Sequence, residues 1–235
     1  MAKQTKKINV GGLLVGGGEK VKIQSMCTTK TSDVEKTVAQ ISALEAAGCD
    51  IIRVSVLDKE DAAAIKNIKT KIIIPLVADI HFSSELACLA VENGANKVRV
   101  NPGNIGGENG VKKVADCLKM HKIPVRIGAN TGSIEKEFLN KFGRNEFALV
   151  ESALAEVSAF EKFGVNDIVI SVKASDAPLT VRAYRLLSAR TNYPLHIGVT
   201  EAGTEEMAVV KSSAALGSLL IDGIGDTLRI SVTDD

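Results

Sequence analysis

Five basic side chains lie within short apolar runs of this sequence, at positions where they could bind an anion together. Each run is rich in β-branched residues and predicts a strand, in which successive side chains face opposite sides. The cations that share the polar face come from five different runs: Arg53, Arg99, Arg126, Lys173 and Arg229. Carboxylates such as Asp79 and Glu201 are too few to neutralise five buried cations, which are costly without anionic partners. A multiply charged anion is the better partner, and a diphosphate fits because arginine binds phosphate oxygens through paired hydrogen bonds.

Three further residues at the ends of these runs could orient a substrate or move a proton. His81 lies two residues after Asp79 in Ala-Asp-Ile-His. Glu201 is at the end of a later run, in Gly-Val-Thr-Glu-Ala-Gly. A carboxylate beside an anion site suits proton transfer or hydroxyl binding, and a histidine suits either role. We expect the other histidines to be structural: His196 as a hydrogen-bonded strand residue, and His121 at a helix end.

Small polar residues accompany the cations. Asn101, Asn130 and Ser231 are on the same predicted strand face. Asn101 also begins a glycine-rich loop, residues 101–110, whose backbone N–H groups could face an anion.

Eight such runs alternate with segments of helical periodicity, which is typical of strand–helix units in a parallel sheet. The runs are Val21–Met26, Ile51–Val56, Ile72–Asp79, Lys97–Asn101, Pro124–Asn130, Asp167–Ser175, Pro194–Thr200 and Thr227–Thr233. The count favours a TIM-like (β/α)8 barrel over an open doubly wound sheet, and no G-x-G-x-x-G follows the first run. In such a barrel the C-terminal ends of the strands line the active-site mouth.

The two ends of the chain depart from this repeat. We expect residues 1–20 to contain a β-hairpin, formed by Ile8–Val10 and Leu13–Val15, that plugs the N-terminal mouth of a barrel spanning residues 21–235. Since no helix is predicted after the last run, the last helix of the barrel should be missing. We therefore expect the chain to be part of a longer polypeptide.

The composition of the 235 residues is that of an ordinary globular protein, with 45% apolar and 24% charged residues. A formal charge of +1 argues against broad binding to nucleic acid or an anionic membrane. We find no secretory signal and no apolar stretch long enough to cross a bilayer. The four cysteines are widely spaced without a C-x-x-C pair, which predicts reduced thiols, no metal site and a cytoplasmic protein.

Segments from one end of the sequence to the other resemble the 4-hydroxy-3-methylbut-2-en-1-yl diphosphate synthase family, which acts in non-mevalonate isoprenoid biosynthesis. The pair KVRVNPGNIG and ADIHF is highly specific. The matching stretches are IQSM (23–26), CDIIRVSV (49–56), PLVADIHF (75–82), KVRVNPGNIG (97–106), VRIGANTGS (125–133), ISVKASD (170–176), PLHIGVTEAG (194–203) and GIGDTLRISVT (223–233).

The resemblance implies an oxidoreductase that opens the ring of 2-C-methyl-D-erythritol 2,4-cyclodiphosphate by two-electron reduction. It assigns diphosphate binding to Arg53, Arg99, Arg126, Asn130, Lys173 and Ser231, with Arg229 beside them, acid–base chemistry to Glu201, and substrate contact to Asp79 and His81. The family's 4Fe-4S cluster is held in a C-terminal domain, is reduced by flavodoxin or ferredoxin, and acts across a homodimer. No cysteine here matches a cluster ligand, so we expect this chain to be the substrate-binding half, inactive alone.

Two other functions remain open at this stage. A pterin-binding barrel of the dihydropteroate synthase type shares the architecture and the use of phosphate, although the five strand cations and KVRVNPGNIG argue against it. A non-catalytic anion-binding module is the alternative if the natural chain ends at Asp235.

Overall fold

The structure is a computed structural model that describes residues 4–232. At its centre is a parallel sheet of eight strands in the order β8-β7-β6-β5-β4-β3-β10-β9. The strands are β3 (Lys22–Met26), β4 (Ile51–Val56), β5 (Leu76–Ile80), β6 (Lys97–Val100), β7 (Val125–Asn130), β8 (Ile168–Lys173), β9 (His196–Ile197) and β10 (Thr227–Leu228). The last and first strands of this order also meet, because the amide of Ile170 donates to the carbonyl of Pro194 at 2.9 Å and that of Thr200 to Ala174 at 3.1 Å. The sheet is thus a nearly closed barrel, as predicted.

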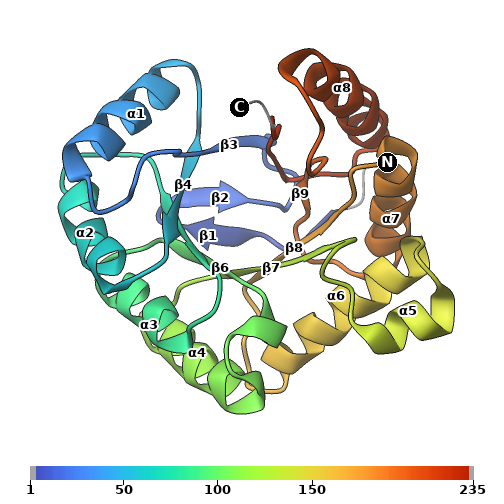
Figure 1. Ribbon diagram of the computed structural model, residues 1–235, viewed down its shortest axis with the longest axis horizontal. Helices are drawn as coiled ribbons and strands as arrows, with labels where there is room; N and C mark the ends of the chain where they lie inside the picture. The colour runs from blue at the N-terminus through green and yellow to red at the C-terminus, as the bar shows by residue number, and fades with distance from the viewer. Residues whose placement is uncertain (1–3, 233–235) are drawn as a thin grey trace.

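Helices surround the strands, and Figure 1 shows this ring opening between α8 and α1. The helices are α1 (Val34–Ala46), α2 (Lys59–Lys69), α3 (Ser84–Glu92), η1 (Pro102–Asn104), α4 (Gly107–His121), α5 (Lys136–Phe142), α6 (Glu146–Glu161), α7 (Ala177–Arg190) and α8 (Glu205–Ile221). No helix follows β10 within residues 4–232, as expected, and Ile23 and Ile230 are left 48% and 49% exposed. None of the described helices has the length and apolar character needed to span a membrane.

The helix ends lie where capping residues predict them. The side chain of Asp33 accepts a hydrogen bond from the amide of Lys36 at the start of α1, and Ser83 accepts one from Leu86 at the start of α3. Gly48 follows α1 with φ = 96°, a conformation that costs glycine little. Pro178 lies in the first turn of α7, where its missing N–H leaves no hydrogen bond unmade.

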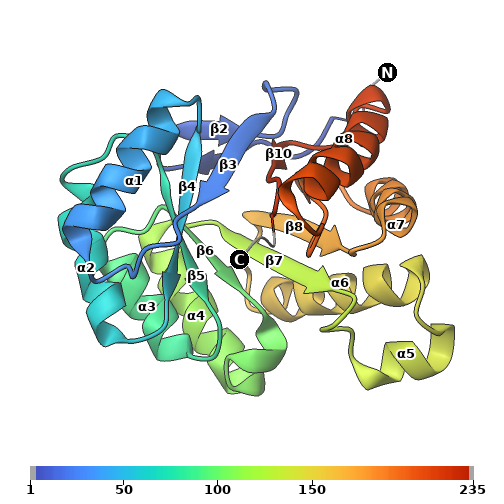
Figure 2. The same cartoon turned by 45° about the horizontal axis from the view of Figure 1, so that its top comes forward.

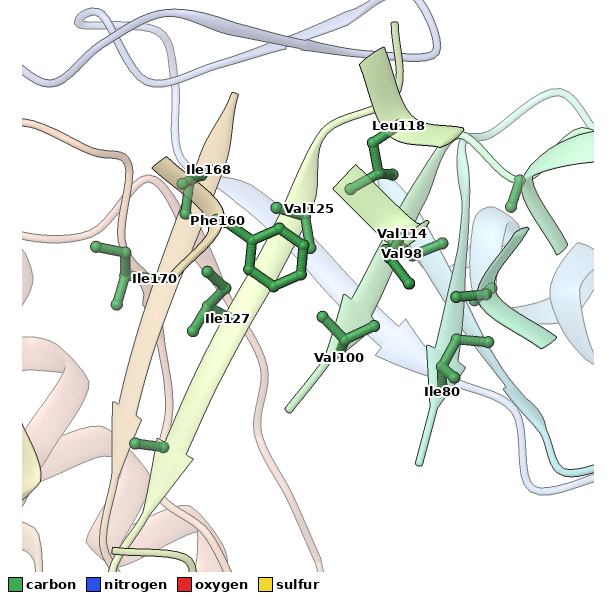
Figure 3. Close-up of a cluster of buried hydrophobic side chains, with 14 of the residues drawn as sticks. Ile80, Val98, Val100, Val114, Leu118, Val125, Ile127, Phe160, Ile168 and Ile170 are labelled. Atoms are coloured by element: carbon green, nitrogen blue, oxygen red, sulfur yellow. The ribbon is translucent and has the colours of Figure 1, made fainter. Parts of the chain in front are cut away.

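The main core lies between the outside of the barrel and the helices. Figure 3 shows outward-facing strand residues such as Val98, Val100 and Ile127 beside Leu118 of α4 and Phe160 of α6. Residues at odd positions on β6, such as Lys97 and Arg99, therefore face the barrel interior. The alternation that builds the core also points the polar side chains inward.

A two-stranded hairpin closes the end of the barrel from which the strands start (Figure 2). Strands β1 (Ile8–Val10) and β2 (Leu13–Val15) pair antiparallel, with Ile8 opposite Val15. Ile8, Val10 and Val15 form a buried cluster with the lowest inward residues of the barrel: Ile51, Val77 and Val169. The predicted plug is confirmed, whereas the division into residues 1–20 and 21–235 stays a prediction whose outer limits lie outside the described residues.

Three predicted strand ranges extend by four or more residues beyond the strands in the structure. The first half of Ile72–Asp79 is wrong, because the chain turns where the amide of Lys71 donates to Ile68 and Pro75 has no N–H to donate. The ranges Pro194–Thr200 and Thr227–Thr233 shrink to two residues each. Beyond these pairs Gly198 packs against the carbonyl of Arg229, where a Cβ atom would lie 2.6 Å away. Thr233 is outside the described residues.

Candidate active site

The strand ends opposite the hairpin enclose a polar cavity of about 180 Å³. All five predicted cations reach it, each from a different strand or strand end. The lining residues are Arg53, Asp79, His81, Arg99, Arg126, Gly128, Asn130, Ser171, Lys173, Thr200 and Arg229. Among the described residues, Asp79 is the only carboxylate that lines it, so the cavity is strongly electropositive.

Asp79 is the centre of the ion pairs in this cavity. One of its oxygens lies 3.3 Å from Nη1 of Arg99, and the other lies 3.6 Å from Nε of Arg53 and 3.5 Å from Nε2 of His81. Burial raises the pKa of Asp79, but the His81 hydrogen bond and the nearby arginine charges outweigh it and hold that pKa well below its usual range. Asp79 therefore stays ionised and neutralises at most one positive charge.

The remaining cations have no such partner. Within residues 4–232, no carboxylate forms an ion pair with Arg126, Lys173 or Arg229, and two guanidinium nitrogens of Arg126, Nε and Nη1, make no hydrogen bond. Burial, together with repulsion from neighbouring cations, lowers the pKa of both Lys173 and Arg126 well below the usual values. Groups of this kind are stabilised when an anion supplies the missing charge and hydrogen-bond acceptors.

Two glycines make room for these long side chains, Gly128 within β7 and Gly198 just after β9. A Cβ atom on Gly128 would lie 2.7 Å from Oγ of Ser171, with the Arg99 guanidinium next to it at 3.7 Å. A Cβ atom on Gly198 would lie 2.8 Å from Nζ of Lys173. Glycine inside a strand weakens the strand, so the presence of Gly128 within β7 indicates space kept for the cavity.

The structure adds a sixth cation that sequence reasoning missed. Lys97 lies two residues before Arg99 on the same strand face, is fully buried, and leaves Nζ without a hydrogen-bond partner. Burial, then repulsion from Arg126 and Arg53, lowers the pKa of Lys97 to about 7. Lys97 is the first residue of β6, beneath the mouth, and its parity with Arg99 is the sequence signal that could have revealed it.

Met26 and Thr200 were also missed. The sulfur of Met26 accepts hydrogen bonds from Arg53, with Nη2 at 2.7 Å and Nε at 3.1 Å, and lies 3.9 Å from Nη1 of Arg229. Thr200 lines the cavity from the end of the β9 segment. Neither residue type is charged, so composition offers no signal for it.

Three residues assigned to the site lie outside the cavity lining. Asn101 is buried, but its side chain accepts a hydrogen bond from the amide of Gly103 and caps η1. Ser231 accepts a hydrogen bond from Nη2 of Arg229 at 3.2 Å and so holds that guanidinium in place. Glu201 is exposed and adopts φ = 48°, an uncommon conformation for a residue with a side chain. Their positions suit support of the site and, for Glu201, the rim of the mouth beside Thr200.

A second and larger cavity of about 610 Å³ adjoins the cationic one, and Arg229 lines both. Met26, Cys27, Thr28 and Ser55 line it as well. The mouth can therefore hold an anionic group among the cations and an uncharged portion of the same molecule beyond Arg229.

No group of three or more His, Cys, Asp or Glu residues in the described part of the chain could hold a metal ion. Burial raises the pKa of all four thiols, to about 12 for Cys27 and Cys117, which disfavours the thiolate form that ligates iron.

The two histidines predicted to be structural lie where expected. Nδ1 of His196 lies 2.8 Å from the hydroxyl of Thr227, and His121 is the last residue of α4.

Comparison with known sequences identifies the family of this barrel. Residues 5–235 match the GcpE TIM-barrel domain. The chain belongs to the GcpE TIM-barrel family. A relative from Caldicellulosiruptor saccharolyticus is 57% identical over 232 residues, which are 98% of this chain and 67% of that protein. One from Caldanaerobacter subterraneus subsp. tengcongensis is 55% identical over 236 residues, covering all of this chain and 66% of the relative. Both are named 4-hydroxy-3-methylbut-2-en-1-yl diphosphate synthase (flavodoxin), and this GcpE-family chain spans about two thirds of their length.

Solved structures resemble the GcpE-family chain in fold alone. Dihydropteroate synthase from Xanthomonas albilineans superposes with a TM-score of 0.67 at 14% identity, covering 96% of this chain and 92% of that one. Type I 3-dehydroquinate dehydratase from Clostridium difficile gives 0.66 at 14% identity, with 98% and 90% covered. Two enzymes of different chemistry match equally well, so the likeness to dihydropteroate synthase reflects the shared barrel.

Proposed function

We propose that this chain is the substrate-binding barrel of a 4-hydroxy-3-methylbut-2-en-1-yl diphosphate synthase, and that its cationic cavity binds the diphosphate of 2-C-methyl-D-erythritol 2,4-cyclodiphosphate. The observation that carries the proposal is the cavity itself, in which five cations surround the single carboxylate of Asp79. The identities of 50–57% to five relatives of that name support the assignment of the substrate.

In this proposal the five cations have two roles, according to whether they pair with Asp79. Arg126, Lys173 and Arg229 are not paired to a carboxylate among the described residues, so they are free to take the diphosphate oxygens. Arg53 and Arg99 are held by Asp79 and complete the rim of the anion site. Asn130 and Ser171 line the same cavity and can donate hydrogen bonds to a phosphate oxygen. The carbon skeleton would then extend past Arg229 into the adjoining cavity.

Proton handling falls to His81 and Glu201. His81 lines the cavity and its Nε2 lies 3.5 Å from the ionised Asp79, which orients the ring. Glu201 stands at the rim with the uncommon φ of 48°, a strain that folded proteins keep mainly where function requires it. A rim carboxylate is placed to exchange protons between solvent and a bound substrate hydroxyl.

The reduction needs electrons that the residues of this barrel do not supply. The family resemblance points to a 4Fe-4S cluster, which would deliver electrons, but the four cysteines do not form a ligand set for it in the described residues. We therefore assign binding, orientation and proton handling to this chain, and no redox step. Homodimerisation, a cytoplasmic location, and flavodoxin or ferredoxin as the electron donor stay predictions. The name of the relatives includes flavodoxin, which supports that donor.

Two measurements on the isolated chain test this division. In calorimetry, pyrophosphate should bind at least ~10-fold more tightly than inorganic phosphate, because it offers more acceptors to the same cations. Equal affinities would contradict a diphosphate site. After incubation with iron and sulfide, the chain should show neither visible cluster absorbance nor turnover. A stable cluster would overturn the interpretation of the cysteines.

A further inference from the structure

Outside the barrel, a cavity of about 380 Å³ lies between η1, the start of α4, and α6. Its lining is mostly apolar, with Pro102, Val111, Ala159 and Phe163 among the residues that form it. This cavity shares no lining residue with the cationic site, so it does not belong to the diphosphate pocket.

A buried carboxyl group of α6 lines this cavity. Glu156 is 4% exposed, and its Oε2 has no hydrogen-bond partner among the described residues. A buried acceptor left without a partner is costly, and native proteins keep one mainly where a ligand or water completes it. Glu156 is therefore a buried polar group without a hydrogen-bond partner at Oε2, in a cavity whose lining is mostly apolar.

The charges around Glu156 favour a positive partner. Glu135, Glu108 and Lys162 also line the cavity. The ammonium of Lys162 is paired with Glu108, so Glu135 and Glu156 are the two lining carboxyl groups that form no ion pair with a lining cation. Arg99 lies outside the lining and lowers the pKa of Glu156, but its effect is smaller than the opposite effect of Glu135.

We propose that this cavity is a binding site for a small organic cation, an alkyl- or arylammonium whose charge is held by Glu156 and whose apolar part packs on Phe163 and Val111. Aromatic faces attract such cations, and an apolar site strengthens the ion pair. In the empty site burial, followed by repulsion from Glu135, raises the pKa of Glu156 to about 8. The carboxyl group is therefore largely protonated at neutral pH and releases its proton when the cation binds.

The test uses benzyltrimethylammonium, a cation without a titratable proton, and benzyl alcohol as the neutral probe. Titration of 15N-labelled protein should shift the amides of Gly103, Gly107 and Glu156, with the cation bound at least ~10-fold more tightly than the alcohol. Affinity for the cation should rise by ~10-fold or more from pH 6 to pH 9, because Glu156 must ionise. Equal affinity for the two probes, a flat pH profile, or shifts only elsewhere would each overturn the proposal.

Two variants make the test specific. Glu156→Gln keeps the shape of the side chain but cannot ionise, so it should lose both the pH dependence and the preference for the cation. Glu161→Gln removes the same charge from the same helix outside the cavity lining and should bind the cation like the wild type. Ala159→Leu fills the cavity and should abolish binding of both probes, whereas binding retained by Ala159→Leu or a preference kept by Glu156→Gln would contradict the site.

Discussion

The two ends of the barrel are built from the same strands and differ sharply in what they enclose. At the N-terminal end, hairpin residues Ile8 and Val10 pack on Ile51, Val77 and Val169, and every member of that cluster is buried. At the C-terminal end, a few residues further along the same strands, the interior holds Arg53, Arg99, Arg126 and Lys173 around Asp79. One end therefore contributes stability, and the other holds uncompensated charge that a ligand must balance.

The largest effect should come from weakening the hydrophobic packing at the N-terminal end of the barrel. Ile8→Ala removes buried methyl groups from the hairpin cluster and should lower the free energy of unfolding by about 2–5 kcal/mol, while pyrophosphate affinity stays unchanged. Urea denaturation and calorimetry measure the two quantities. Leu14→Ala, on the exposed side of the same hairpin, should cost clearly less. A loss of pyrophosphate affinity in folded Ile8→Ala would contradict the separation of the two ends.

The cationic end should respond in the opposite way. Arg126→Ala should weaken pyrophosphate binding by about 1.5–3 kcal/mol, the scale of a charge-assisted hydrogen bond, without lowering the free energy of unfolding. Arg185→Ala is the matched control, since it removes the same charge from the surface of α7, where Arg185 pairs with Asp222. Unchanged affinity in Arg126→Ala would remove this residue from the anion site.

Lys97 sharpens the comparison because it lies between the two ends. The pKa of Lys97 is lowered to about 7, so the unfolded chain holds this proton more tightly than the folded one. The free energy of unfolding should therefore rise with pH between about 7 and 10, where the unfolded state binds more protons. Lys97→Met should be more stable than the wild type by about 1–2 kcal/mol near pH 7, with the difference shrinking towards pH 10.

Denaturation at several pH values measures this difference. A Lys97→Met variant that is less stable than the wild type at pH 7, or a difference that does not change with pH, would mean that Lys97 has an anionic partner in the folded protein. Pyrophosphate affinity of the same variant should fall, because one positive charge beneath the site is lost.

The smallest effect should come from Glu201. Its side chain is exposed and outside the cavity lining, so Glu201→Gln should leave pyrophosphate affinity within about a factor of two. In a full-length synthase that contains this barrel, the same change should reduce turnover, because we propose that Glu201 moves a proton. A large change in pyrophosphate affinity would instead place this side chain in the anion site.

Much of the fold could be predicted because alternation along a strand is a local property. The positions of Arg99, Arg126 and Lys173 relative to their apolar neighbours determined which side chains would meet inside the barrel. Strand ends were less predictable. In Ile72–Asp79 the apolar run begins before the strand does. Apolar residues occupy both the segment before β5 and β5 itself, so residue type does not mark where the strand starts. Hydrogen bonding to the neighbouring strands decides where each strand starts. The residues of one strand do not contain that information.

The limits at the site have a similar cause. Met26 has no charge to mark it, yet its sulfur accepts hydrogen bonds from Arg53. Asn101 was assigned to the anion site because it shares a predicted strand face with Arg99. In the folded chain its side chain instead caps η1. Lysine is mostly exposed in proteins, and the burial of Lys97 follows from the closed barrel rather than from its local sequence. Sequence alternation shows which way a side chain points, and the tertiary structure decides what it meets.

The most direct test of the proposed function is calorimetric titration of this chain with 2-C-methyl-D-erythritol 2,4-cyclodiphosphate and with methylerythritol, which has the same carbon skeleton and no phosphate. The cyclodiphosphate should bind saturably, and the phosphate-free polyol should show no saturation at ~100-fold higher concentration. Saturating binding of methylerythritol with equal affinity would contradict the central claim that the five cations bind a diphosphate.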